Sequence, residues 1–178
     1  MRRNGLLCAA LALLLTACAH APAPARLGLK LAPAALGDTV SVQQHLMVER
    51  QGRIDELDAA LEIDAQQVQI VGLAFGQRVL TVAFDGEKLT SWRHLMLPRE
   101  VRAEDVLEDV QLSLWPAAAI ARVLPAGWRI EEQGLVRTLY LNDALVTTIT
   151  YSGLPRWSGT VTLDNRRYGY RLTITSAP

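Results

Sequence analysis

Cys18 is the residue whose type and setting point most directly to chemistry. It follows the apolar run Leu6–Leu15, and Arg2 and Arg3 stand in front of that run. A run of about ten apolar residues is too short to span a bilayer, but a positive start, a short apolar stretch and small residues before a cleavage point are typical of a secretory signal peptide. We therefore expect residues 1–17 to be removed.

The tetrapeptide Leu15-Thr16-Ala17-Cys18 resembles the lipobox of bacterial lipoproteins. The resemblance implies that the Cys18 thiol receives diacylglycerol and its amino group an acyl chain such as palmitate, so that membrane lipid holds the protein through Cys18. Ala19 stands where an Asp would resemble a signal for retention in the inner membrane. We therefore expect the periplasmic face of the outer membrane of a Gram-negative bacterium. An ordinary secretory signal followed by a chance cysteine is the alternative.

Length and charge limit the classes of function. Cleavage before Cys18 removes 17 residues and leaves 161 of the 178, with 16 basic and 18 acidic side chains. We expect a short tether over 18–26 and a single domain over 27–178, which is long enough for a sizeable core. The net charge of −2 provides no strong positive field, so nucleic acid is not expected as a partner. Cys8 leaves with the signal peptide and lipid blocks Cys18, so neither a free thiol nor a disulfide is expected.

The side chains that most often perform catalysis or bind metals form no recognisable motif. His20, His45 and His94 show no paired-ligand spacing. No serine lies in a GxSxG sequence, and no phosphate-binding glycine motif occurs. We therefore expect no metal, no cofactor and no catalytic residues, although a carboxylate pair assembled by folding would leave no local signature.

The hydrophobic pattern predicts strands, then two helices, then strands. Residues 57–64 alternate between apolar and polar, which favours a strand over a helix there. Asp85-Gly86 is a typical hairpin turn. The expected strands are 39–50, 57–64, 67–74, 77–84, 88–92, 128–132, 135–141, 144–152, 160–163 and 168–176.

The period changes to that of a helix after Pro98. Ala103–Leu114 has apolar residues at helical spacing and acidic residues in its first turns. Pro116 suits the first turn of a helix, and Ala117–Leu124 predicts a second short helix that ends before the Pro-Ala-Gly sequence 125–127.

This order of elements predicts a mainly β fold. Short connections imply an antiparallel meander. We expect a curved antiparallel sheet, an incomplete β-barrel, with the helical pair as a lid on its concave face. Such a half-barrel can hold an apolar ligand between sheet and lid, whereas an ordinary filled core is the alternative for the large aromatic residues. The candidate cavity-lining residues are Val106, Leu107, Val110, Leu114, Trp115, Trp92 and Trp128.

Three segments are similar to parts of LolB, the outer-membrane lipoprotein receptor. They are Ala103–Gly127 (its helical pair), Gly72–Gly86 (its hairpin) and Thr160–Ser176 (its terminal strand pair). The stretches LEDVQLSLWPAAAI, LPAGW and GYRLTITS are similar to uncharacterised LolB-like lipoproteins associated with aryl polyene lipid gene clusters. The resemblance implies an eleven-stranded half-barrel with a helical lid and an apolar cavity.

LolB-like proteins accept lipidated cargo from a periplasmic LolA-like carrier and use a leucine on a protruding loop to pass it to the membrane. Position by position that leucine falls on Phe75, and Ala74 replaces the proline of the tip. The resemblance thus implies Leu73 and Phe75 as membrane-insertion candidates. The sequence leaves open whether Phe75 is exposed at the tip or packs under the edge of the sheet.

We expect a non-catalytic, outer-membrane-anchored protein that binds a lipid or lipidated cargo and passes it to the membrane. A structural or assembly partner of an envelope export complex, with a filled core, is the alternative. An enzyme acting on acyl groups is a third. A cavity would distinguish the first from the second, and a cluster of Ser, His and acid would favour the third.

Overall fold

The computed structural model of the chain describes residues 26–177. The predicted signal peptide, Cys18 and the predicted tether up to residue 25 lie outside the described residues. The elements are η1 (Pro33–Leu36), β1 (Val40–Arg50), β2 (Arg53–Ile63), β3 (Val68–Ala74), β4 (Gln77–Phe84), β5 (Leu89–Arg93), α2 (Ala103–Leu114), α3 (Ala117–Ala121), β6 (Trp128–Gln133), β7 (Val136–Leu141), β8 (Ala144–Tyr151), β9 (Gly159–Asn165) and β10 (Tyr170–Ala177).

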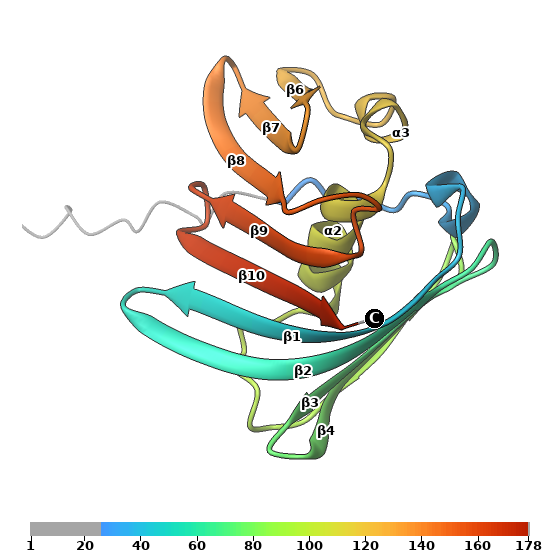
Figure 1. Cartoon of the computed structure of the whole chain (residues 1–178), viewed down its shortest axis with the longest axis vertical. Helices are drawn as coiled ribbons and strands as arrows, with labels where there is room; N and C mark the ends of the chain where they lie inside the picture. Colours follow the sequence, from blue (N-terminus) through green and yellow to red (C-terminus); the bar gives the residue numbers. More distant parts are fainter. Residues whose placement is uncertain (1–25, 178) are drawn as a thin grey trace, which may run out of the picture.

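Within residues 26–177 the strands form one antiparallel sheet of ten, in the order β5-β4-β3-β2-β1-β10-β9-β8-β7-β6. Two meanders, β1–β5 and β6–β10, meet where the first strand pairs with the last, with Leu46 opposite Ile174. The sheet is strongly curved and stays open between its edge strands β5 and β6 (Figure 1). The predicted incomplete barrel is confirmed, with ten strands in the described chain instead of the eleven that the LolB resemblance implies.

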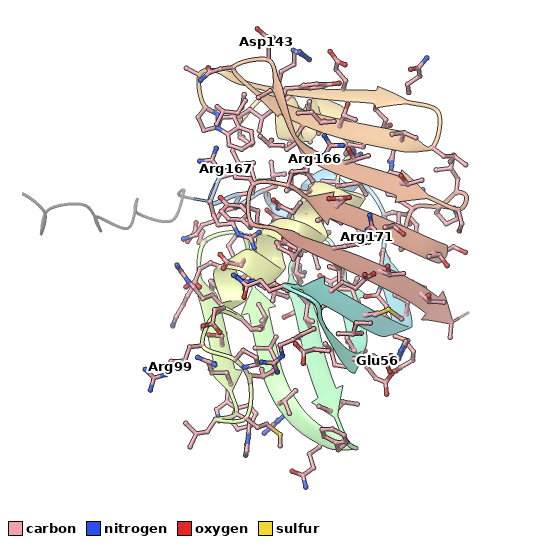
Figure 2. All side chains as sticks on the ribbon, turned by 90° about the vertical axis from the view of Figure 1, so that its left-hand side faces the viewer. Glu56, Arg99, Asp143, Arg166, Arg167 and Arg171 are labelled. Carbon is pink, nitrogen blue, oxygen red and sulfur yellow. The ribbon has the colours of Figure 1, made fainter. Side chains whose placement is uncertain are left out.

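The strand registers show which turns lie at the same end of the sheet. The β1–β2, β3–β4, β7–β8 and β9–β10 turns lie at one end, which we call the tip end, together with the chain that leaves β5. The turns after β2 and β4 lie at the opposite end. Figure 1 shows the β1–β2 and β9–β10 turns on the left, and Figure 2 looks onto that side.

Helix α2 lies inside the curve of the sheet (Figure 1). Its bounds agree with the predicted helix, and Leu107, Leu112 and Leu114 are buried in the core that the sheet contributes to. Helix α3 ends at Ala121 instead of the expected Leu124, because a turn from Ile120 to Val123 closes it shortly before Pro125. No helix in residues 26–177 has both the length and the hydropathy that a membrane span needs.

Candidate functional site

The β3–β4 turn projects an apolar side chain into solvent. Phe75 and Gly76 both have positive φ, 52° and 71°, as the central residues of a type I′ hairpin turn do. The left-handed region disfavours a bulky side chain by about 1 kcal/mol or more. Phe75 is nevertheless 96 % exposed, so no packing within the described chain offsets this strain. Of the two positions that the sequence left open for Phe75, exposed at the tip or packed under the sheet edge, the exposed one is therefore correct. Leu73, the other membrane-insertion candidate, lies half-buried in β3.

A second apolar group lies at the same end of the sheet. The His94 N–H donates to the carbonyl of Val79 at 2.8 Å, which holds the chain after β5 beside the start of β4. Leu95 and Met96 follow, and they are 98 % and 53 % exposed. We call Phe75, Leu95 and Met96 the apolar tip. Exposed apolar side chains at one end of a sheet are candidates for a surface that contacts proteins or membranes.

Trp92 lies on the surface of the molecule and not in its interior. It is 45 % exposed, and the Arg78 guanidinium lies 5.0 Å from the centre of its ring. The expectation that Trp92 lines a cavity is therefore wrong. The residue occupies edge strand β5, where its exposed ring accepts a cation–π contact.

The other candidate lining residues belong to the hydrophobic core or pack against it. Trp115 is fully buried, and its indole N–H donates to the Ala32 carbonyl at 3.1 Å. Leu107 and Leu114 are buried, whereas Val106, Val110 and Trp128 are partly buried against the same core. Two pockets are described, one at the β1–β2 and β9–β10 turns and one at the start of β1, and neither is lined by a residue of α2 or α3. Neither of these two pockets is therefore the cavity expected between the helical lid and the sheet.

Polar contacts hold α2 to the chain that precedes β1. Gln111 is fully buried and pairs with the backbone of Leu31, accepting from its N–H at 3.0 Å and donating to its carbonyl at 2.9 Å. The Gly28 N–H donates to Glu108 Oε2 at 2.6 Å. These bonds satisfy groups that would be costly to leave unpaired in the interior.

Arg26 forms the centre of a charged cluster at the first described residue. Its Nη1 lies 2.9 Å from Asp109 Oδ1, and its Nε lies 3.5 Å from Asp105 Oδ1. The Tyr170 hydroxyl also donates to Asp109, at 2.7 Å. Burial raises the pKa of Asp109, and the nearby Arg26 guanidinium opposes this rise. Burial likewise raises the pKa of Glu108. The acidic start of α2 was visible in the sequence, but its partner Arg26 was missed.

Arg137 anchors the other end of α2. Its side chain is fully buried on β7, donates to Glu132 Oε2 from Nε at 2.9 Å and from Nη2 at 2.6 Å, and donates to the carbonyl of Leu112. A guanidinium at the C-terminus of a helix satisfies a free carbonyl and favours the helix dipole. No local pattern in the sequence indicates this role, because Arg137 occupies an ordinary position in the alternation of β7.

The two histidines of the described chain, His45 and His94, make separate local contacts. His45 Nδ1 lies 2.9 Å from Asp58 Oδ1 on the exposed surface, and His94 Nδ1 accepts from the Met96 N–H at 3.2 Å. Residues 26–177 contain no group of three or more His, Cys, Asp or Glu side chains placed to hold a metal ion.

Comparison with known families decides the classification. Residues 41–178 match the family DUF3261, described as "Protein of unknown function". The chain belongs to the DUF3261 family. The match begins within β1 and includes the helical pair and the sheet from there on. No curated protein matches the chain. Among solved structures, a DUF1329 family protein from Desulfovibrio piger ATCC 29098 aligns with a TM-score of 0.36 and 11 % identity, over 82 % of this chain and 87 % of that one.

Proposed function

We propose that this DUF3261 protein is a LolB-like lipoprotein of the outer membrane, without catalytic activity, that binds lipid or lipidated cargo and passes it to the membrane. Acylated Cys18 would hold it at the periplasmic face, and a periplasmic LolA-like carrier would supply the cargo. The candidate cargo is an aryl polyene lipid or its acyl precursor. The LolB resemblance and the open half-barrel support the proposal.

The observation that carries this proposal is Phe75. Phe75 is unfavourable for the isolated domain in two ways: its φ of 52° strains the backbone, and its side chain, 96 % exposed, leaves an apolar ring in water. Within the described chain no contact of the ring offsets these two costs in free energy. Transfer of a phenylalanine side chain from water into an apolar layer gains about 1.5–3 kcal/mol. Insertion of the apolar tip into a membrane is the contact that makes this turn favourable.

The position of the tether supports the same orientation. Arg26 follows Cys18 by eight positions, so an extended chain would reach at most about 29 Å from the anchor. Arg26 lies beside Tyr170, the first residue of β10, and that strand begins at the tip end. An anchor at Cys18 therefore brings the tip end toward the membrane.

The packed interior sets a condition on cargo binding. Each CH₂ of an acyl chain gains about 0.8 kcal/mol on leaving water, so a long chain supplies on the order of 10 kcal/mol. An acyl chain entering between α2 and the sheet must displace side chains such as Leu107 and Leu114. We propose that α2 moves away from the sheet when cargo enters.

An assembly role in an envelope complex is the second candidate. Two observations favour this assembly role. The fully buried Trp115 side chain occupies interior space, and the paired hydrogen bonds of Gln111 to Leu31 hold α2 in place. In that function the apolar tip would contact a protein partner.

Exchange of a fluorescent phospholipid between vesicles distinguishes the two. The acylated full chain is reconstituted into acceptor vesicles and mixed with donor vesicles that hold the self-quenched lipid. We expect the wild type to accelerate transfer and Phe75→Asn to lose most of the acceleration. Asn accepts positive φ, so this variant removes the apolar ring without straining the turn.

Val123→Asn is the matched control, since Val123 is an exposed apolar residue beyond α3 (50 % exposed) and outside the apolar tip. It should transfer lipid like the wild type. A wild-type protein that does not accelerate exchange, or a Phe75→Asn variant as fast as the wild type, would overturn the lipid-transfer proposal and favour the assembly role.

A further inference from the structure

An open pocket of about 390 Å³ lies between the β1–β2 and β9–β10 turns at the tip end. Its walls come from both hairpins, because Arg50 is opposite Arg53 across β1–β2 and opposite Tyr170 across β1–β10. Pockets for small ligands usually have volumes of about 300–1,000 Å³, so this one suits a compact group. Figure 2 looks onto this end and shows Arg166 and Arg171 on the surface it presents.

Four arginines line this pocket: Arg50, Arg53, Arg166 and Arg171. Its acidic lining consists of Glu49 and Asp164. The Asp164 carboxylate lies 3.2 Å from Arg171 Nη2, which leaves the lining with a surplus of positive charge. Guanidinium groups bind phosphate oxygens with two parallel hydrogen bonds, so they are the cations best suited to a phosphate group.

Two of these arginines lack a counter-charge. Across residues 26–177 neither Arg50 nor Arg166 has a carboxylate within 4 Å, and both side chains are exposed. Arg53 reaches Asp55 only at 3.9 Å. Like charges directly opposite each other in an antiparallel pair destabilise the pairing, and Arg50 and Arg53 are such a pair. An anion between them would remove the repulsion.

The pocket is also close to the predicted anchor. Tyr170 contributes to its lining, and the Arg26 guanidinium lies 5.5 Å from the centre of the Tyr170 ring. Arg26 follows Cys18 by eight residues. A pocket beside the point where the tether enters the domain lies within reach of the headgroups of the membrane that holds Cys18.

We propose that this pocket binds the phosphate group of an anionic lipid headgroup, with Arg50 and Arg166 as its principal ligands. The membrane origin of the phosphate rests on the proposed function, whereas the phosphate chemistry rests on the pocket alone. Binding there would fix the orientation of the half-barrel on the membrane while the apolar tip enters the lipid.

Calorimetry on the full chain in a non-ionic detergent tests this proposal with three probes: short-chain phosphatidylglycerol, short-chain phosphatidylcholine and inorganic phosphate. The wild type should bind phosphatidylglycerol, and the Arg50→Gln/Arg166→Gln double variant should bind it at least about tenfold more weakly, since it loses two charge-assisted contacts. Lys88→Gln/Arg122→Gln is the control. It removes the same charge from exposed residues outside the pocket and should bind like the wild type.

Equal binding of phosphatidylglycerol by the wild type and the Arg50→Gln/Arg166→Gln variant would overturn the proposal. Binding of inorganic phosphate alone, dependent on both arginines, would confirm the phosphate site and overturn its membrane origin. Loss of lipid exchange in Phe75→Asn together with unchanged headgroup binding in the arginine variant would refute the phosphate site and leave the proposed function standing.

Discussion

Arg26 Nη1 lies 2.9 Å from Asp109 Oδ1, and this ion pair joins the first described residue of the chain to helix α2. Both side chains are largely shielded from solvent, with 19 % and 13 % exposed. If Cys18 is the anchor, the predicted tether enters the domain at Arg26. Arg26 also holds α2, the helix that we propose moves when cargo enters. Tension or rearrangement at the tether would reach α2 directly.

Removing Arg26 should destabilise the domain, because the buried Asp109 carboxylate would lose its cation and keep only the hydrogen bond from the Tyr170 hydroxyl. We expect Arg26→Gln to lower the free energy of unfolding in urea by about 3 kcal/mol. The control Arg102→Gln removes an arginine whose side chain is 62 % exposed and should change stability by less than about 0.5 kcal/mol. A small effect of Arg26→Gln, equal to that of the control, would show that the ion pair does not hold α2.

The raised pKa of Asp109 predicts a pH dependence with a definite sign. The folded protein holds a proton on this carboxyl at a pH where the unfolded chain, with an ordinary value near 3.8, has released it. This contribution to stability therefore increases as the pH falls from neutrality through the folded pKa toward the unfolded one, and it is absent above the folded pKa. The stability of the wild type relative to Asp109→Asn should rise on acidification in urea titrations. A decrease in this relative stability on acidification would mean that the ion pair with Arg26 has a larger effect on the pKa of Asp109 than burial has.

Arg137 offers a second test of how α2 is held. We expect Arg137→Gln to lower the free energy of unfolding by about 3–5 kcal/mol, because it leaves Glu132 without this partner and removes a donor to the Leu112 carbonyl. Arg129→Gln, on neighbouring strand β6 with a half-exposed side chain, should cost less than about 1 kcal/mol. Equal losses in the two variants would contradict a specific role for the buried guanidinium.

The turn at Phe75 should become more stable when its apolar residue is removed. Asn-Gly is the preferred type I′ sequence, so Phe75→Asn should raise the free energy of unfolding by about 0.5–1 kcal/mol. Phe75→Glu should leave the melting temperature nearly unchanged, because the side chain is exposed. A loss of several kcal/mol in either variant would indicate that Phe75 packs against the domain in solution.

Cys18→Ala tests the predicted anchor. We expect this variant to stay unprocessed or to appear soluble in the periplasm, whereas Cys8→Ala, a change within the predicted signal peptide, should fractionate like the wild type with the outer membrane. Recovery of Cys18→Ala in the outer-membrane fraction would contradict the lipobox interpretation.

Local patterns in the sequence were sufficient for much of the fold. The spacing of apolar residues gave the bounds of α2, Ala103–Leu114, and alternation identified β2 in spite of its helical alternative. Both signals lie within one element, where periodicity of side-chain placement is the controlling property. The turn at Phe75 could also be located, because it separates two alternating runs.

The site depends on contacts that local patterns do not contain. Arg26 meets Asp109 across 83 residues, and Gln111 meets Leu31 across 80. The arginines of the pocket come from two hairpins that become neighbours only when β1 pairs with β10. Whether the apolar residues of α2 enclose a cavity or fill one depends on the fit of side chains in three dimensions. The sequence could therefore name Leu107, Leu114 and Trp115 as interior residues but not determine what they surround.

The depth of position 75 in a membrane tests the central claim most directly. Phe75→Cys gives the mature chain a single free thiol, since Cys8 is expected to be removed and Cys18 to be acylated, and this thiol can carry an environment-sensitive fluorophore. The same label on Val123→Cys is the control. With the protein on vesicles, we predict blue-shifted emission at position 75 that lipid-attached quenchers reduce, and water-like emission at position 123. Water-like, unquenched emission at position 75 would contradict the account.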